Sequence, residues 1–70
     1  MDLRHTVRMP LDVAQLSSLS TALDELTARI VSLADTYQES PREDVASDLY
    51  EVERNLLAAS RRLKALLAKL

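Results

Sequence analysis

Glycine and cysteine are both missing from this chain of 70 residues. Without cysteine, disulfides and thiolate metal sites are excluded. Without glycine, phosphate-binding loops of the G-x-x-x-x-G-K or G-x-G-x-x-G type are excluded. The single histidine, His5, has no cysteine and no second histidine with which to bind a metal or activate a nucleophile. We therefore expect no enzymatic activity and no cofactor.

Long apolar runs are missing as well. The longest, such as Leu56-Leu57-Ala58-Ala59, are far shorter than the roughly 20 residues that span a bilayer. Residues 1–10 contain no continuous apolar segment of the kind found in secretory signals. We expect no membrane span, and a cytoplasmic location is the default. The amphipathic segment 56–70 has basic residues on its polar face. It has no Trp or Phe to anchor it at a membrane, so burial against another helix is the favoured interpretation.

The composition favours helices and a binding partner. Hydrophobic residues make up 47% of the chain and aromatic residues only 3%, with leucine and alanine dominating, which is typical of helical proteins. A chain of this length forms one domain at most. Small domains without disulfides or metals are marginally stable alone, so oligomerisation is the remaining means of stabilisation.

Two stripes of apolar residues repeat at alternating spacings of three and four. This is the heptad pattern of packed helices, and no strand-like alternation accompanies it. The first stripe is Leu16, Leu19, Leu23, Leu26, Ile30, Leu33 and Tyr37, and the second is Val45, Leu49, Val52, Leu56, Ala59, Leu63, Leu66 and Leu70. The pattern predicts two amphipathic helices, at about 11–38 and 41–69.

The segment Glu39-Ser-Pro-Arg-Glu-Asp44 separates the two stripes. Ser40 and Glu43 have the spacing of a capping box, and Pro41 occupies the favoured first position of a helix. A turn at 39–40 is short, and connections of two to four residues favour antiparallel neighbours, so we predict a helical hairpin. The alternative is an opened, nearly straight pair of helices, because no glycine is present to end the first one.

The predicted apolar surface is wider than one seam between two helices can cover. Tyr50 and Leu57 lie beside the second stripe, one heptad apart. The predicted fold is therefore all-α: an antiparallel helical hairpin (residues 11–70) that dimerises into a four-helix bundle or coiled coil. The partner is a second copy, another helical protein, or both. The predicted core and interface residues are Leu16, Leu19, Leu23, Leu26, Ile30, Leu33, Val45, Leu49, Tyr50, Val52, Leu56, Leu57, Leu63 and Leu66.

Charge is distributed unevenly along the hairpin. Residues 35–53 contain seven acids and one arginine, a net charge of −6, whereas residues 54–70 contain five bases and no acid, a net charge of +5. One interpretation is that acids near the start and bases near the end of the second helix complement its dipole. The other is that two hairpins packed head-to-tail place each acidic turn beside the partner's basic end.

Residues 1–10 are predicted to form an N-terminal arm, extended or disordered. Residues 2–9 alternate polar side chains with apolar ones and His5, as in a strand, and Pro10 opens the first helix. A short strand followed by two helices resembles the ribbon-helix-helix repressors and antitoxins over about residues 3–16. The resemblance implies that Arg4, Thr6 and Arg8 read DNA. The long first helix and the turn without glycine depart from that family. Alternatively, the arm packs apolar side chains over the open end of the hairpin.

Two functions follow as expectations. The first is a small non-enzymatic module that oligomerises through its helices and binds other proteins. The alternative is a small regulator that binds DNA or RNA through the arm and the basic end of the hairpin. Its phosphate contacts would be Arg4, Arg8, Arg61, Arg62, Lys64 and Lys69. The net charge of −2 and the isoelectric point near 5.2 argue against this alternative.

Overall fold

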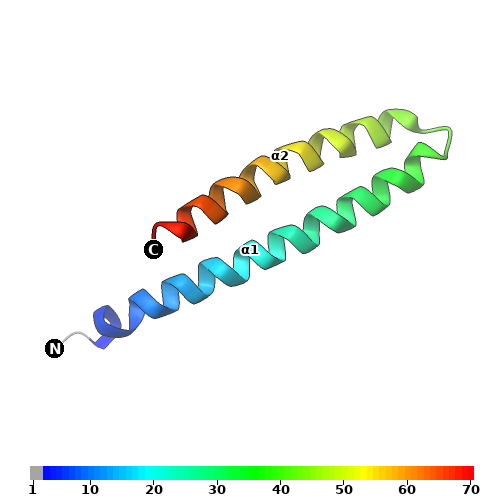
Figure 1. Ribbon diagram of the computed structural model, residues 1–70. Coiled ribbons are helices and arrows are strands. Elements are labelled where there is room, and N and C mark those ends of the chain that lie inside the picture. Colours follow the sequence, from blue (N-terminus) through cyan, green and yellow to red (C-terminus); the bar gives the residue numbers. More distant parts are fainter. Residues whose placement is uncertain (1–2) are drawn as a thin grey trace.

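The chain folds into two long antiparallel helices that pack along each other (Figure 1). A computed structural model describes the backbone of residues 3–70 and the side chains of residues 12–70. Helix α1 spans Leu3–Gln38 and helix α2 spans Glu43–Ala68. Together they form a rod of 61 × 18 × 12 Å. The prediction of an all-α hairpin is confirmed, and the nearly straight pair of helices is wrong. Dimerisation stays a prediction.

Helix α1 begins earlier than predicted. Residues 3–10, predicted as an extended or disordered arm, are helical, and Pro10 lies inside α1 instead of opening it. Extending an existing helix fixes one residue for each added hydrogen bond, and leucine, arginine and methionine are good helix formers. A short alternation of apolar and polar residues does not outweigh these effects. Figure 1 shows this end of α1 extending past the end of α2.

The turn at residues 39–42 is closed by short-range hydrogen bonds. The Ser40 hydroxyl donates to the Tyr37 carbonyl at 2.7 Å and accepts from the Arg42 backbone N–H at 3.1 Å. The predicted capping box does not form, because this hydroxyl is already used by the turn and Arg42 becomes the N-cap of α2. No residue of the described backbone has a positive φ, so the turn needs no glycine.

A stripe of small residues forms the centre of the hairpin seam. The buried side chains recur at spacings of seven in α1 and fourteen in α2. They are Ser20, Thr27 and Ala34 in α1, with Ala46 and Ser60 in α2. Ala34 and Ala46 are 0% exposed. Small side chains at these positions let the two backbones approach closely. The Thr27 hydroxyl donates to the Leu23 carbonyl at 2.8 Å, so its burial leaves no unpaired polar group.

Polar contacts fasten one side of this seam. Ser60 donates a 2.7 Å hydrogen bond to the Asp24 carboxylate, and Lys64 donates to the same carboxylate at 2.8 Å. Nearer the turn, the Tyr50 hydroxyl donates to a carboxylate oxygen of Asp35 at 2.6 Å. These contacts fix which residues of α1 lie level with which residues of α2.

Candidate protein-interaction surface

Three leucines of α1 remain exposed although they belong to the predicted core stripe. The exposed fractions of Leu19, Leu26 and Leu33 are 59%, 46% and 48%. Each directly precedes a buried small residue in the sequence. Because one residue turns a helix by about 100°, these leucines lie about a quarter turn away from the seam. The strongest apolar stripe of α1 is therefore only partly used by the hairpin.

Helix α2 repeats the same arrangement. Val45 and Ala59 directly precede the buried Ala46 and Ser60, and Val52 and Leu66 directly precede the half-buried Glu53 and Leu67, which complete the seam of α2 at spacings of seven. Val52 and Leu66 are exposed large apolar side chains. In both helices the exposed stripe lies one residue before the seam. Because the helices run antiparallel, this equal offset places the two exposed stripes on the same side of the hairpin. We call this surface the open face; it comprises Leu19, Leu26, Leu33, Val45, Val52, Ala59 and Leu66.

The open face is one continuous surface across both helices. The contacts from Asp24 to Ser60 and from Asp35 to Tyr50 set the register of the two helices. In this register Leu33 lies level with Val52, Leu26 with Ala59, and Leu19 with Leu66. Half-buried apolar side chains fill the strip between the two exposed stripes; they are Leu16, Leu23, Ile30 and Tyr37 in α1, with Leu49, Leu56 and Leu63 in α2.

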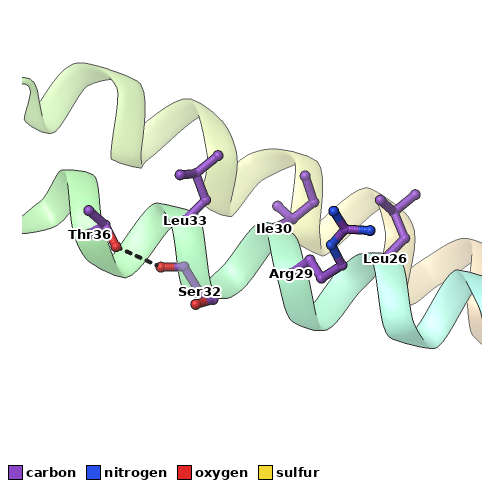
Figure 2. Close-up of a pocket in the computed structure, with 6 residues that line it drawn as sticks. All are labelled: Leu26, Arg29, Ile30, Ser32, Leu33 and Thr36. Carbon is purple, nitrogen blue, oxygen red and sulfur yellow. Dashed lines mark hydrogen bonds between the residues drawn. The ribbon is translucent and has the colours of Figure 1, made fainter.

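A hollow lies at the middle of α1, beside the open face. It is lined by Leu26, Arg29, Ile30 and Leu33, together with Ser32 and Thr36. In Figure 2, Leu26, Ile30 and Leu33 extend from α1 in the same general direction, and Arg29 lies between Ile30 and Leu26. Four residues at i, i+3, i+4 and i+7 form the hole that receives a side chain from a facing helix in a coiled coil. Four of the six residues that line the hollow therefore have the spacing of such a hole.

The predicted core residues divide into two groups. The half-buried ones are Leu16, Leu23, Ile30, Val45, Leu49, Tyr50, Leu56 and Leu63, and the exposed ones are Leu19, Leu26, Leu33, Val52, Leu57 and Leu66. Leu57 lies away from the open face, on the side of Tyr50. The small buried residues of the seam were not predicted as core. Their signal in the sequence is the recurrence of Ser20, Thr27 and Ala34 every seven residues.

The side opposite the open face contains Leu57 and Tyr50 together with the polar contacts between α1 and α2 described above. Hydrogen bonds from Lys64 and Ser60 lower the pKa of Asp24. The hydrogen bond to Asp35 raises the pKa of Tyr50, because that bond requires the protonated hydroxyl. The two sides of the hairpin therefore differ in chemistry, and only the open face presents a continuous apolar stripe over the described side chains.

Polar side chains, three of them charged, border the open face along α2. Asp48, Asn55, Arg62 and Lys69 recur every seven residues and are exposed. The first three each lie four residues before a member of the open face, and residues four apart are neighbours on a helix surface. The border changes from acidic near the turn to basic near the open end. On α1 the exposed Arg29 has the corresponding position near the middle.

Among the side chains that the structure describes, the predicted nucleic-acid contacts lie on more than one side of α2. Lys64 is paired with Asp24, while Arg61 and Arg62 follow one another and so point in directions about 100° apart. The side chains of Arg4 and Arg8 lie outside the described ones. The strand that the ribbon-helix-helix resemblance requires is absent, because the described backbone from residue 3 to 38 is helical.

Within the described part of the chain, no helix has the length and apolar character of a membrane span. No group of three or more histidines, aspartates or glutamates is placed to hold a metal ion among the described side chains. Comparisons with protein-family models, curated proteins and solved structures found no match to this chain.

Proposed function

We propose that this protein is a small, non-enzymatic interaction module that assembles through its open face with a second pair of helices. The exposure of Leu19, Leu26 and Leu33 in one straight stripe carries this proposal. Isolated exposed leucines are common on protein surfaces, whereas a continuous apolar stripe marks a surface that another molecule covers.

Burial of these side chains supplies the driving force. Covering a leucine completely is worth about 1.5–3 kcal/mol, and those of the open face have roughly half of their surface left to bury. The hairpin alone buries no large side chain completely among those described. Since small domains are stable by only about 5–15 kcal/mol, covering several such side chains changes the stability of this fold substantially.

The shape of the surface favours helices as the occupant. The half-buried and exposed residues of the open face together repeat at spacings of three and four, which is the pattern that helices use to interlock. The hollow between Leu26 and Leu33 has the arrangement of a hole for one incoming side chain. A second hairpin laid on this face completes a four-helix bundle.

Solution mass tests this proposal. We expect size-exclusion chromatography with light scattering to give a multiple of the 7.8 kDa chain mass, and the variant Leu26→Lys/Leu33→Lys to lose the assembly. The matched control is Ser18→Lys/Ala28→Lys, which adds the same charge at exposed positions of α1 outside the open face. A native chain that is cooperatively folded, strictly monomeric at high concentration and purified from its cell with no companion bound would refute the proposal.

A further inference from the structure

We infer that the occupant of the open face is a second copy of this chain, docked antiparallel, with the turn of each hairpin over the open end of the other. This inference rests on the proposed function and adds the identity and the orientation of the partner. The two copies are related by a twofold axis that lies between their open faces and runs perpendicular to the helices. It lays α1 on the partner's α1 and α2 on the partner's α2, and it passes near Asn55 and Arg29.

The apolar residues of the open face are self-complementary about this axis. In α2 the midpoint of the stripe lies between Val52 and Ala59, so Val52 faces the partner's Ala59 and Val45 faces the partner's Leu66. A larger side chain thus meets a smaller one in both pairs. In α1 the midpoint lies between Leu26 and Leu33, level with the midpoint in α2, and it coincides with the hollow. A single twofold axis therefore passes through the midpoints of both apolar stripes.

The formal charges of the two halves of the hairpin favour the antiparallel orientation. The turn half, residues 29–53, has seven acids and two arginines, a net charge of −5. The open half, residues 12–28 with 54–70, has three acids and five bases, a net charge of +2. Antiparallel docking places −5 against +2 at both ends. Parallel docking, with turn over turn, places −5 against −5 and is opposed by like-charge repulsion.

The charged residues along the α2 edge of the open face also favour the antiparallel orientation. Asp48 and Arg62 are each seven residues from Asn55, so the antiparallel axis brings Asp48 opposite the partner's Arg62 twice in the dimer. On α1 it brings Arg29 near the partner's Arg29, which is one unfavourable pair. Parallel docking would instead set Asp48 beside the partner's Thr36 and Arg62 beside the partner's Ala22. Two attractive pairs against one repulsive pair leave a net preference for the antiparallel dimer.

The size of the face suits a stable dimer. The two helices lie side by side over the length of α2, whose 26 residues span about 39 Å. A face of that length and 18 Å wide offers roughly 700 Å², close to the area of about 800 Å² that standard stable interfaces bury on each partner. The second hairpin also covers all seven residues of the open face at once. No segment outside the hairpin is needed to complete the bundle.

Cross-linking between single cysteines tests the orientation, because the native chain has none. The probe is a bis-maleimide whose span matches the separation of packed helices, about 8–10 Å. We expect Asn55→Cys to cross-link to its own copy, and a mixture of Asp48→Cys and Arg62→Cys to form the mixed dimer. Asp48→Cys alone should fail, since its two copies lie about 21 Å apart along the helices. Ala58→Cys, on the exposed back of α2, is the matched control.

The outcomes separate this inference from the proposed function. A mixture of Arg29→Cys and Asn55→Cys that cross-links efficiently, while Asn55→Cys alone does not, would establish parallel docking and overturn the inference with the assembly intact. A native chain of monomeric mass would overturn the inference, and one that in addition is purified from its cell with no companion bound would overturn both. A dimer in which none of these pairs reacts would show that the open face is not the contact between copies.

Discussion

The hydroxyl of Tyr50 in α2 donates a 2.6 Å hydrogen bond to a carboxylate oxygen of Asp35 in α1, and it joins the helices near the turn. This bond raises the pKa of Tyr50 above its ordinary value of about 10. Because the pKa is raised in the folded state, the bond stabilises the hairpin fully below pH ~10 and its contribution is lost as pH rises through the folded pKa.

We therefore expect Tyr50→Phe to reduce the loss of stability at alkaline pH. Denaturant unfolding, followed by circular dichroism from pH 8 to about 11, measures this. The native chain should lose stability more steeply above pH ~10 than the variant, while the variant is less stable at neutral pH. Tyr37→Phe is the control, since it retains the bond to Asp35. Equal slopes for Tyr50→Phe and the native chain would contradict the role assigned to this hydroxyl.

The carboxylate of Asp24 has the opposite pH dependence. Lys64 and Ser60 lower its pKa in the folded state, so its contribution is present above the unfolded value of about 3.9. It is lost as pH falls through the lower, folded pKa. Asp24→Asn should be less stable than the native chain at neutral pH, and the difference should shrink as pH falls below about 4. Stability measured by urea unfolding at several pH values checks this.

A matched variant keeps that comparison specific to Asp24. Glu25→Gln removes a neighbouring exposed carboxylate that makes no hydrogen bond among the described side chains. It should leave the acid dependence close to that of the native chain. If Glu25→Gln changes the acid dependence as much as Asp24→Asn does, then general charge repulsion is responsible rather than the contact between α1 and α2.

The small residues of the seam set the distance between the helices. Ala46 is 0% exposed, so a larger side chain there must push the helices apart. We expect Ala46→Leu to destabilise the hairpin by about 1–3 kcal/mol, the usual cost of overpacking. Ala58→Leu makes the same chemical change at an exposed position of α2 and should be nearly neutral. Thermal unfolding of both variants makes the comparison, and equal stabilities would show that the small stripe does not set the packing.

The sequence predicts the helices well but not which face of them meets. The spacing of three and four correctly indicates two helices and a hairpin. It places Leu33 in the core stripe and Ala34 outside it, whereas the hairpin buries Ala34 completely and leaves Leu33 half exposed. Hydrophobicity identifies the side chains that gain most from burial. How closely two helix backbones approach depends instead on where the side chains are small. In this chain the small residues and the large apolar residues occupy different positions of the heptad.

The ends of the helices are less predictable for a related reason. The Ser40 hydroxyl can cap α2 or close the turn after α1, and both uses fit the same local sequence. The start of α1 depends on whether helix extension outweighs an interior proline. Neither choice changes the residues of the open face, because these lie at 19–33 and 45–66, inside the helices and away from both the turn and the start of α1. The candidate site could therefore be predicted as a set of apolar residues, but its separation from the seam could not.

Reversing one charge at the border of the open face should weaken the proposed antiparallel dimer. Asp48→Arg turns two attractive pairs with the partner's Arg62 into two repulsive pairs. Because exposed ion pairs are worth only about 0.2–1 kcal/mol each, we expect the dimer Kd to rise roughly tenfold at low salt and less at high salt. Analytical ultracentrifugation over a range of concentrations measures this.

The double variant Asp48→Arg/Arg62→Asp makes that test specific. It exchanges the two charges and restores attraction across the antiparallel axis, so its Kd should return to near the native value. Glu25→Arg, at an exposed position of α1 outside the open face, controls for the change in net charge. In a parallel dimer Asp48 and Arg62 face neutral side chains and cannot compensate one another. An Asp48→Arg variant that dimerises as tightly as the native chain, or more tightly, would therefore argue for that orientation, and a double variant that remains as weak as Asp48→Arg would show that Asp48 does not pair with the partner's Arg62.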